Sequence, residues 1–86
     1  MIEKKNKSQK NIVGIKLRNI RSEKGVSQVD LSRKLMDSGV NLTNSALSKV
    51  EAGSRGVFDY ELLGIAHCLD TTVNSFFDDE ELGISN

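Results

Sequence analysis

The stretch TNSALSKVEAGSR, residues 43–55, has the pattern of a short helix with one thin apolar edge. Thr43 suits a helix N-cap, and Gly53 suits the left-handed residue that follows a helix end. Leu47 and Val50 form the inward edge. The opposite face carries Asn44, Ser45, Ser48 and Lys49. This face is too polar to be buried and too weakly charged for an ordinary solvated helix, so it is a candidate binding surface.

The sequence predicts four further short helices around this one. Their apolar positions are Val13, Leu17 and Ile20; Leu31 and Leu35; Leu62, Ile65, Ala66 and Leu69; and Val73, Phe76 and Phe77. The residues predicted to cap them are Asn11, Ser27, Asp59 and Thr72, and Gly25 ends the first. No strand pattern competes with these helices. We therefore expect an all-α fold, a compact five-helix bundle.

The length of 86 residues fits one small domain. Residues 1–10 are polar and rich in lysine, which predicts a flexible basic N-terminal arm that either contacts phosphates or keeps the protein soluble. Residues 11–78 form the predicted helical domain, and residues 79–86 a predicted acidic, frayed C-terminal tail.

Charge is divided unevenly along the chain, although the formal net charge is zero. Residues 1–49 hold eleven Lys or Arg against four Asp or Glu, a net charge of +7. Residues 50–86 hold one Arg against eight Asp or Glu, a net charge of −7. Such a division favours one face that meets an anion and another that avoids it.

Several protein classes do not fit the sequence. There is no signal peptide pattern and no run of about 20 apolar residues that would cross a membrane. The single cysteine, Cys68, fits a reducing compartment, so we expect a cytoplasmic protein. His67 and Cys68 are adjacent on one predicted helix, so their side chains point in different directions and do not form a catalytic pair. We expect no enzyme activity, no metal site and no cofactor.

From Val13 to Phe77 the chain resembles the Xre/Cro-like helix-turn-helix family of bacterial and phage repressors. The resemblance rests on LRNIRSEKGVSQVDLSRKL (17–35), LTNSALSKVEAGSR (42–55) and YELLGIAHCLDTTVNSFF (60–77). It implies a lambda-repressor-like domain whose second and third helices form the DNA-binding unit. The implied function is a sequence-specific transcriptional regulator, and we expect it to be a repressor.

The resemblance assigns roles to the residues of these two helices. Asn44, Ser45 and Lys49 match positions that contact bases, and the outward-facing Ser48 joins them as a weaker candidate. Such groups suit the task, because Asn pairs with adenine edges, Lys with guanine or phosphate, and Ser with several bases. The residues implied in phosphate contact lie at the helix start and after Gly53: Ser27, Gln28, Ser54 and Arg55.

Arg21 and Glu51 match positions where the family shows an ion pair between the first and third helices. We expect this pair to be structural, holding the third helix at its angle. The turn between Leu35 and Leu42 is longer than the common family version. Its MDSGVN segment (36–41) either extends the second helix or loops out, so Asn44 is either a base reader or a neighbour of the cap.

The expected partner is double-stranded DNA, bound by a homodimer on a two-fold operator. Tyr60, Phe76 and Phe77 are candidates for the dimer surface, although Phe76 also suits the core. The alternative function is a protein-interaction module of the same fold, such as an antitoxin or accessory regulator subunit. The acidic C-terminal half, with Leu82 and Ile84, would then belong to the surface for a protein partner.

Overall fold

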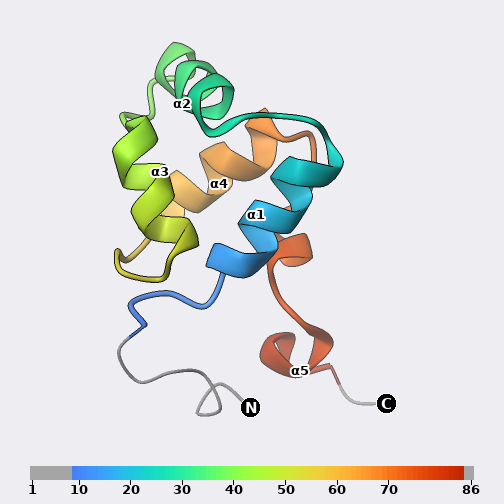
Figure 1. The fold of residues 1–86 in the computed structure, drawn as a ribbon. Helices are drawn as coiled ribbons and strands as arrows, with labels where there is room; N and C mark the ends of the chain where they lie inside the picture. Colours follow the sequence, from blue (N-terminus) through green and yellow to red (C-terminus); the bar gives the residue numbers. More distant parts are fainter. Residues whose placement is uncertain (1–8, 85–86) are drawn as a thin grey trace.

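The computed structural model describes residues 9–84, which form helices and no strands (Figure 1). The elements are α1 (Gly14–Glu23), α2 (Gln28–Asp37), α3 (Asn44–Glu51), α4 (Asp59–Cys68), the short 3-10 helix η2 (Val73–Phe76) and α5 (Asp79–Leu82). The all-α prediction is confirmed. All five predicted helices are present, the last of them as η2, and α5 is an addition.

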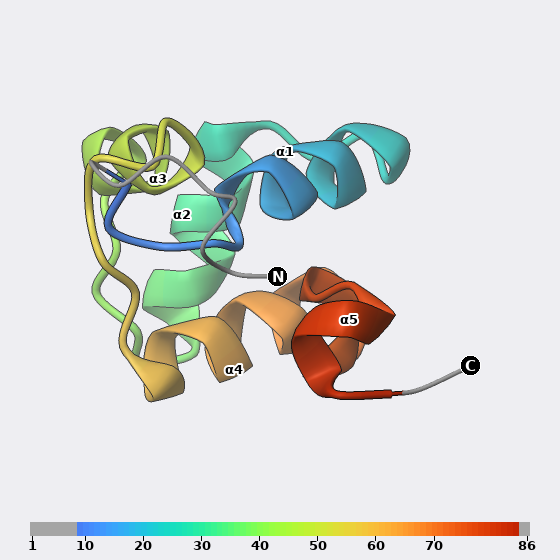
Figure 2. The same cartoon turned by 90° about the horizontal axis from the view of Figure 1, so that it is seen from below.

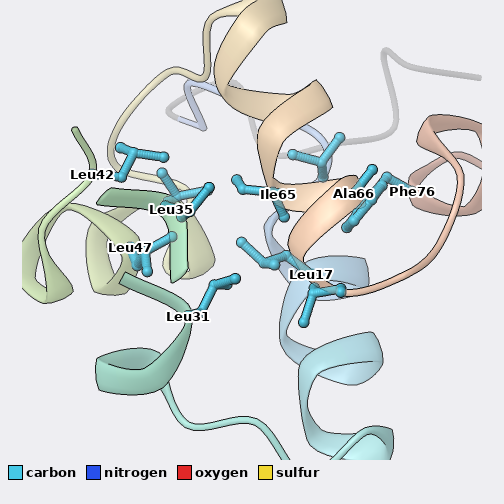
Figure 3. Close-up of a cluster of buried hydrophobic side chains, with 11 residues drawn as sticks. Leu17, Leu31, Leu35, Leu42, Leu47, Ile65, Ala66 and Phe76 are labelled. Carbon is cyan, nitrogen blue, oxygen red and sulfur yellow. The ribbon is translucent and has the colours of Figure 1, made fainter. Parts of the chain in front are cut away.

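The core forms where the apolar edges of the helices converge (Figure 3). Leu31 and Leu35 of α2 and Leu47 of α3 are fully buried, as the helical spacing predicted. Leu17 from α1 and Ile65 from α4 close the cluster from the other side. Burial of each such side chain contributes about 1.5–3 kcal/mol, so this aliphatic cluster fixes α3 against the rest of the domain.

The predicted starts of α2 and α3 are confirmed. The Ser27 hydroxyl oxygen accepts a hydrogen bond from the Asp30 backbone N–H at 3.0 Å. The Thr43 hydroxyl oxygen accepts one from the Ala46 N–H, also at 3.0 Å. Each bond satisfies an N–H group that has no partner inside its helix. Both helices of the predicted DNA-binding unit therefore begin where the sequence indicates.

The predicted cap of α4 is wrong, and the predicted cap of the last helix has the expected position but makes no capping hydrogen bond. Asp59 is the first residue of α4 rather than its cap, and the N-cap position is held by Phe58. The Phe58 side chain has no acceptor for the N–H groups of the first turn, while the carboxylate of Glu61 accepts the N–H of Phe58 itself at 3.0 Å. Thr72 does occupy the N-cap position of η2, but its hydroxyl makes no capping hydrogen bond.

The C-terminal segment is more ordered than the predicted frayed tail. Glu81 accepts a hydrogen bond from the Asp78 N–H at 2.8 Å at the start of α5, and Gly83 ends the helix with φ of +78°. An ion pair joins Asp78 to Lys16 of α1. Figure 1 and Figure 2 both place α5 at the opposite end of the molecule from α3.

Most of the predicted basic arm, and the last two residues of the predicted tail, lie outside the described residues. The division of the chain at residues 10 and 78 stays a prediction. Within residues 9–84, no helix combines the length and the apolar character needed to span a membrane.

Candidate nucleic-acid interface

The outward face of α3 is the candidate reading surface. Leu47 and Val50 face inward and are fully buried, where α3 packs against α1 and α2. The four side chains predicted to contact bases are all exposed: Asn44, Ser45, Ser48 and Lys49. Asn44 is the first helical residue, directly after the Thr43 cap. One short helix therefore presents four hydrogen-bonding side chains to solvent while its other edge is held in the core.

The long connection between α2 and α3 is packed against the domain. α2 ends at Asp37, so part of the MDSGVN segment extends this helix and the rest forms a turn. Leu42 is fully buried, and its backbone carbonyl accepts a hydrogen bond of 2.6 Å from the buried Ser32 hydroxyl. Val40 lies against α4 at Gly64. These contacts fix the start of α3 in spite of the longer turn.

Arg21 of α1 and Glu51 of α3 form the expected ion pair. Arg21 Nε lies 2.7 Å from Glu51 Oε2, and Arg21 Nη2 lies 3.0 Å from Oε1. The side chains are only 16% and 6% exposed. Hydrogen bonding to Glu51 raises the pKa of Arg21 further above its already high value. A bidentate pair at this burial holds α3 at a fixed angle to α1.

Gln28 joins the same network at the start of α2. Its side-chain amide donates a hydrogen bond of 3.1 Å to Glu51 Oε1. Glu51 therefore accepts from both α1 and α2 while belonging to α3. The predicted phosphate-contacting side chain is thus oriented by an internal partner, with one amide hydrogen and its oxygen left for a ligand.

A hollow of about 300 Å³ opens beside this network. Its lining is mostly polar and comes from three helices: Arg18, Arg21, Gln28, Ser48, Glu51 and Ala52. Because Ser48 also belongs to the outward face of α3, the hollow borders the candidate reading surface.

Arg55 has an unexpected partner. Its guanidinium binds Glu61 through Nη1 at 3.0 Å and Nη2 at 3.2 Å, and Nη1 also donates to the Gly56 carbonyl at 2.8 Å. The Glu61 side chain is 4% exposed and that of Arg55 is 30% exposed. Arg55 therefore ties the loop after α3 to α4, and two of its five N–H groups remain for another partner.

The pKa of Glu61 reflects two opposing influences. Burial alone raises it, but the hydrogen bonds from Arg55 and from the Phe58 backbone, together with the Arg55 charge, outweigh that effect. The pKa of Glu61 therefore lies below its usual range, and the carboxylate is charged at neutral pH. Sequence reasoning missed this residue. The available signal was the spacing: Glu61 lies three positions after Phe58 and six after Arg55, where an acidic residue can complete a capping box.

The remaining predicted phosphate contacts are serines. Ser27 and Ser54 are both exposed, at the start of α2 and after the end of α3. The Ser27 oxygen already accepts the capping bond, which leaves its O–H free to donate. The Ser54 hydroxyl donates to the Lys49 carbonyl at 3.3 Å.

Asn11 connects the start of α1 to the end of α3. Its side-chain oxygen accepts hydrogen bonds from the Val13 and Gly14 N–H groups at 2.9 and 2.8 Å. The N-cap position is held by Val13 rather than by the predicted Asn11, which stabilises the start of α1 from two residues earlier. The Asn11 side-chain N–H₂ donates to the carbonyls of Val50 and Arg55 at 3.0 and 2.7 Å. The second pair of bonds, which the sequence did not reveal, ties the last turn of α3 and the loop after it to the start of α1.

The chain resembles a solved structure over most of its length. The restriction-modification controller protein C.AhdI from Aeromonas hydrophila is 32% identical to it, with a TM-score of 0.67. The match covers 76% of this chain and 87% of C.AhdI. The chain belongs to the Xre/Cro-like helix-turn-helix family.

As a member of the Xre/Cro-like family, the chain is a DNA-binding transcriptional regulator, and α2 and α3 are its helix-turn-helix. No family model matches the sequence, and no curated protein does. The resemblance predicted from three stretches of sequence is confirmed. The roles of individual residues in DNA contact stay predictions.

Proposed function

We propose that this regulator reads duplex DNA by placing α3 in the major groove and acts as a transcriptional repressor. The observation that carries the proposal is the exposed polar face of α3 on a helix whose other edge is fully buried. Asn44, Ser45 and Lys49 are the proposed base contacts, with Ser48 beside them. The first turn of a recognition helix enters the groove most deeply, which suits Asn44 and Ser45.

Phosphate contacts are proposed on both sides of α3. Ser27 and Gln28 lie at the start of α2, where free N–H groups favour an anion. Ser54 and Arg55 lie in the loop after α3, and Arg55 would use the two N–H groups that Glu61 and Gly56 leave free. These contacts would fix the position of α3 on the duplex without reading sequence.

The distribution of charge supports this orientation. Most of the basic residues precede α4, whereas the acidic α5 lies at the end of the molecule farthest from α3 (Figure 2). A DNA backbone that approached α3 would therefore not meet the acidic segment. We propose the cytoplasm as the compartment, and the likeness to C.AhdI makes a restriction-modification locus a natural setting.

A homodimer on a two-fold operator is part of the proposal, because one recognition helix contacts only a few base pairs. Tyr60 is 59% exposed, and its ring stacks on that of the 62% exposed Phe58, with centroids 5.8 Å apart. Together with the exposed Leu63, they form an apolar surface on the first half of α4. Phe76 is fully buried, so its assignment to a dimer surface is wrong, and Phe77 is half-buried.

Selection of binding sites from random duplex DNA tests the proposal. The expected result is enrichment of a palindrome, with half-sites about one helical turn apart. Sedimentation with and without that site should show two chains per duplex, and a single chain in both conditions would remove the dimer. No enrichment above random sequence would contradict DNA reading and favour a protein-interaction module. The exposed Leu82 and Ile84 are the observation behind that alternative.

A further inference from the structure

Two arginines line the hollow beside α3, and within residues 9–84 only one of them has a counterion. Arg21 is neutralised by Glu51, and Gln28 and Ser48 are neutral. Arg18 is exposed, and no residue of the described chain pairs with it. The side chains that line the hollow therefore carry a net charge of +1, from Arg18.

The position of Arg18 makes this charge useful. Arg18 and Arg21 are three residues apart on α1, so they share one face of the helix. Two neighbouring arginines repel one another, and a single carboxylate, from Glu51, offsets only one of them. An anion in the hollow would neutralise the remaining positive charge, and Gln28 and Ser48 would offer it uncharged hydrogen-bond donors.

The place of the hollow relative to α3 suggests which anion. Ser48 belongs both to the lining of the hollow and to the outward face of the recognition helix. The major groove is about 12 Å wide, so a helix lying in it has phosphates along both flanks. We propose that Arg18 binds a backbone phosphate of duplex DNA in this hollow, with Gln28 and Ser48 alongside. The proposal rests on the proposed function and adds to its phosphate contacts a residue of α1.

Arg18 suits phosphate better than a lysine would at the same position. Its planar guanidinium offers paired N–H donors that match two phosphate oxygens. The contact carries no base information, so its loss should weaken binding to all duplexes by a similar factor.

The test is the salt dependence of duplex binding by Arg18→Gln. Each phosphate neutralised by a protein cation contributes about 0.9 to the slope of log K against log salt concentration. We expect Arg18→Gln to reduce that slope by about 0.9 and to weaken binding roughly tenfold at low salt, for the selected site and a scrambled site alike. Arg18→Lys keeps the charge and should keep the slope.

Lys16→Gln is the matched control. Lys16 lies on the same helix, and its substitution removes the same charge, but its partner is Asp78 near α5. An unchanged slope for Arg18→Gln, in a wild-type protein that binds duplex with steep salt dependence, would overturn the assignment of Arg18 alone. An equal loss of slope in Lys16→Gln would overturn it as well, since general charge would then explain the effect. A wild-type protein that binds no duplex would overturn both proposals.

Discussion

Gly14, the first residue of α1, lies where the backbones of α1 and α3 approach one another closely. A Cβ atom added there would overlap the Val50 carbonyl oxygen and would lie 2.9 Å from the Glu51 carbonyl oxygen. Backbone oxygens cannot rotate away as a flexible side chain can, so the two helices would have to separate. Overpacking of this kind costs about 1–3 kcal/mol.

Helix propensity predicts the opposite sign for Gly14→Ala. Alanine is favoured over glycine in a helix by up to about 1 kcal/mol. We expect the overlap to dominate and the substitution to lower the free energy of unfolding by about 2 kcal/mol. For a chain of this size, that corresponds to a fall in Tm of about 8–16 °C.

Thermal unfolding followed by circular dichroism measures this effect. Gly56→Ala is the control, because a Cβ there would meet only the Lys10 carbonyl at an ordinary 3.6 Å. We expect Gly56→Ala to leave Tm unchanged or slightly raised. A Tm for Gly14→Ala at or above that of the wild type would refute the close approach of α1 and α3.

Three further predictions concern the contacts that hold α3. Arg21→Ala should lower the free energy of unfolding by about 3 kcal/mol in a urea titration, because the buried Glu51 carboxylate would lose its counterion. Equal stabilities of the two proteins would show that the pair is not structural. Glu61→Gln should be less stable than the wild type at pH 7, where the wild-type carboxylate is charged. The difference in stability should shrink as pH falls below the unfolded-state pKa of about 4.3 and then through the lower folded-state pKa. Over that range the wild type also loses its charged carboxylate. A difference in Tm between the two proteins that stayed the same from about pH 3 to about pH 7 would contradict the depressed pKa of Glu61. Asn11→Ala should cost about 1–2 kcal/mol by the same urea titration, because the bonds to the start of α1 and those to Val50 and Arg55 are lost together. A cost below about 0.5 kcal/mol would argue against both roles.

The features that could be predicted from the sequence are those that depend on near neighbours. Leu31, Leu35 and Leu47 recur at helical spacing, and each is fully buried. Ser27 and Thr43 cap the helices that follow them, because a hydroxyl reaches an N–H group three residues on without help from the rest of the chain.

The features that were missed depend on residues brought together by the fold. The local sequence places Glu61 close to Arg55, but it does not show that Glu61 is buried, or that Gln28 donates to Glu51. The burial of Glu61 depends on how α4 packs in the domain, and the Gln28 bond depends on α2 and α3 lying side by side. Asp59 was the expected cap of α4 because aspartate favours that position, but the helix begins one residue earlier than expected, with Phe58 as the N-cap. The exposure of Phe58 likewise depends on how α4 packs in the domain, which the sequence does not show.

The binding ratio between a selected operator and a scrambled duplex of the same composition tests the central claim most directly. Fluorescence anisotropy at one fixed salt concentration would give both dissociation constants for the wild type, Asn44→Ala and Lys49→Ala. We expect a wild-type ratio of about 10³ or more, reduced by either substitution. Tm should stay unchanged, because both side chains are exposed. A wild-type ratio close to one, or a ratio that neither substitution changes, would contradict the reading of DNA by the outward face of α3.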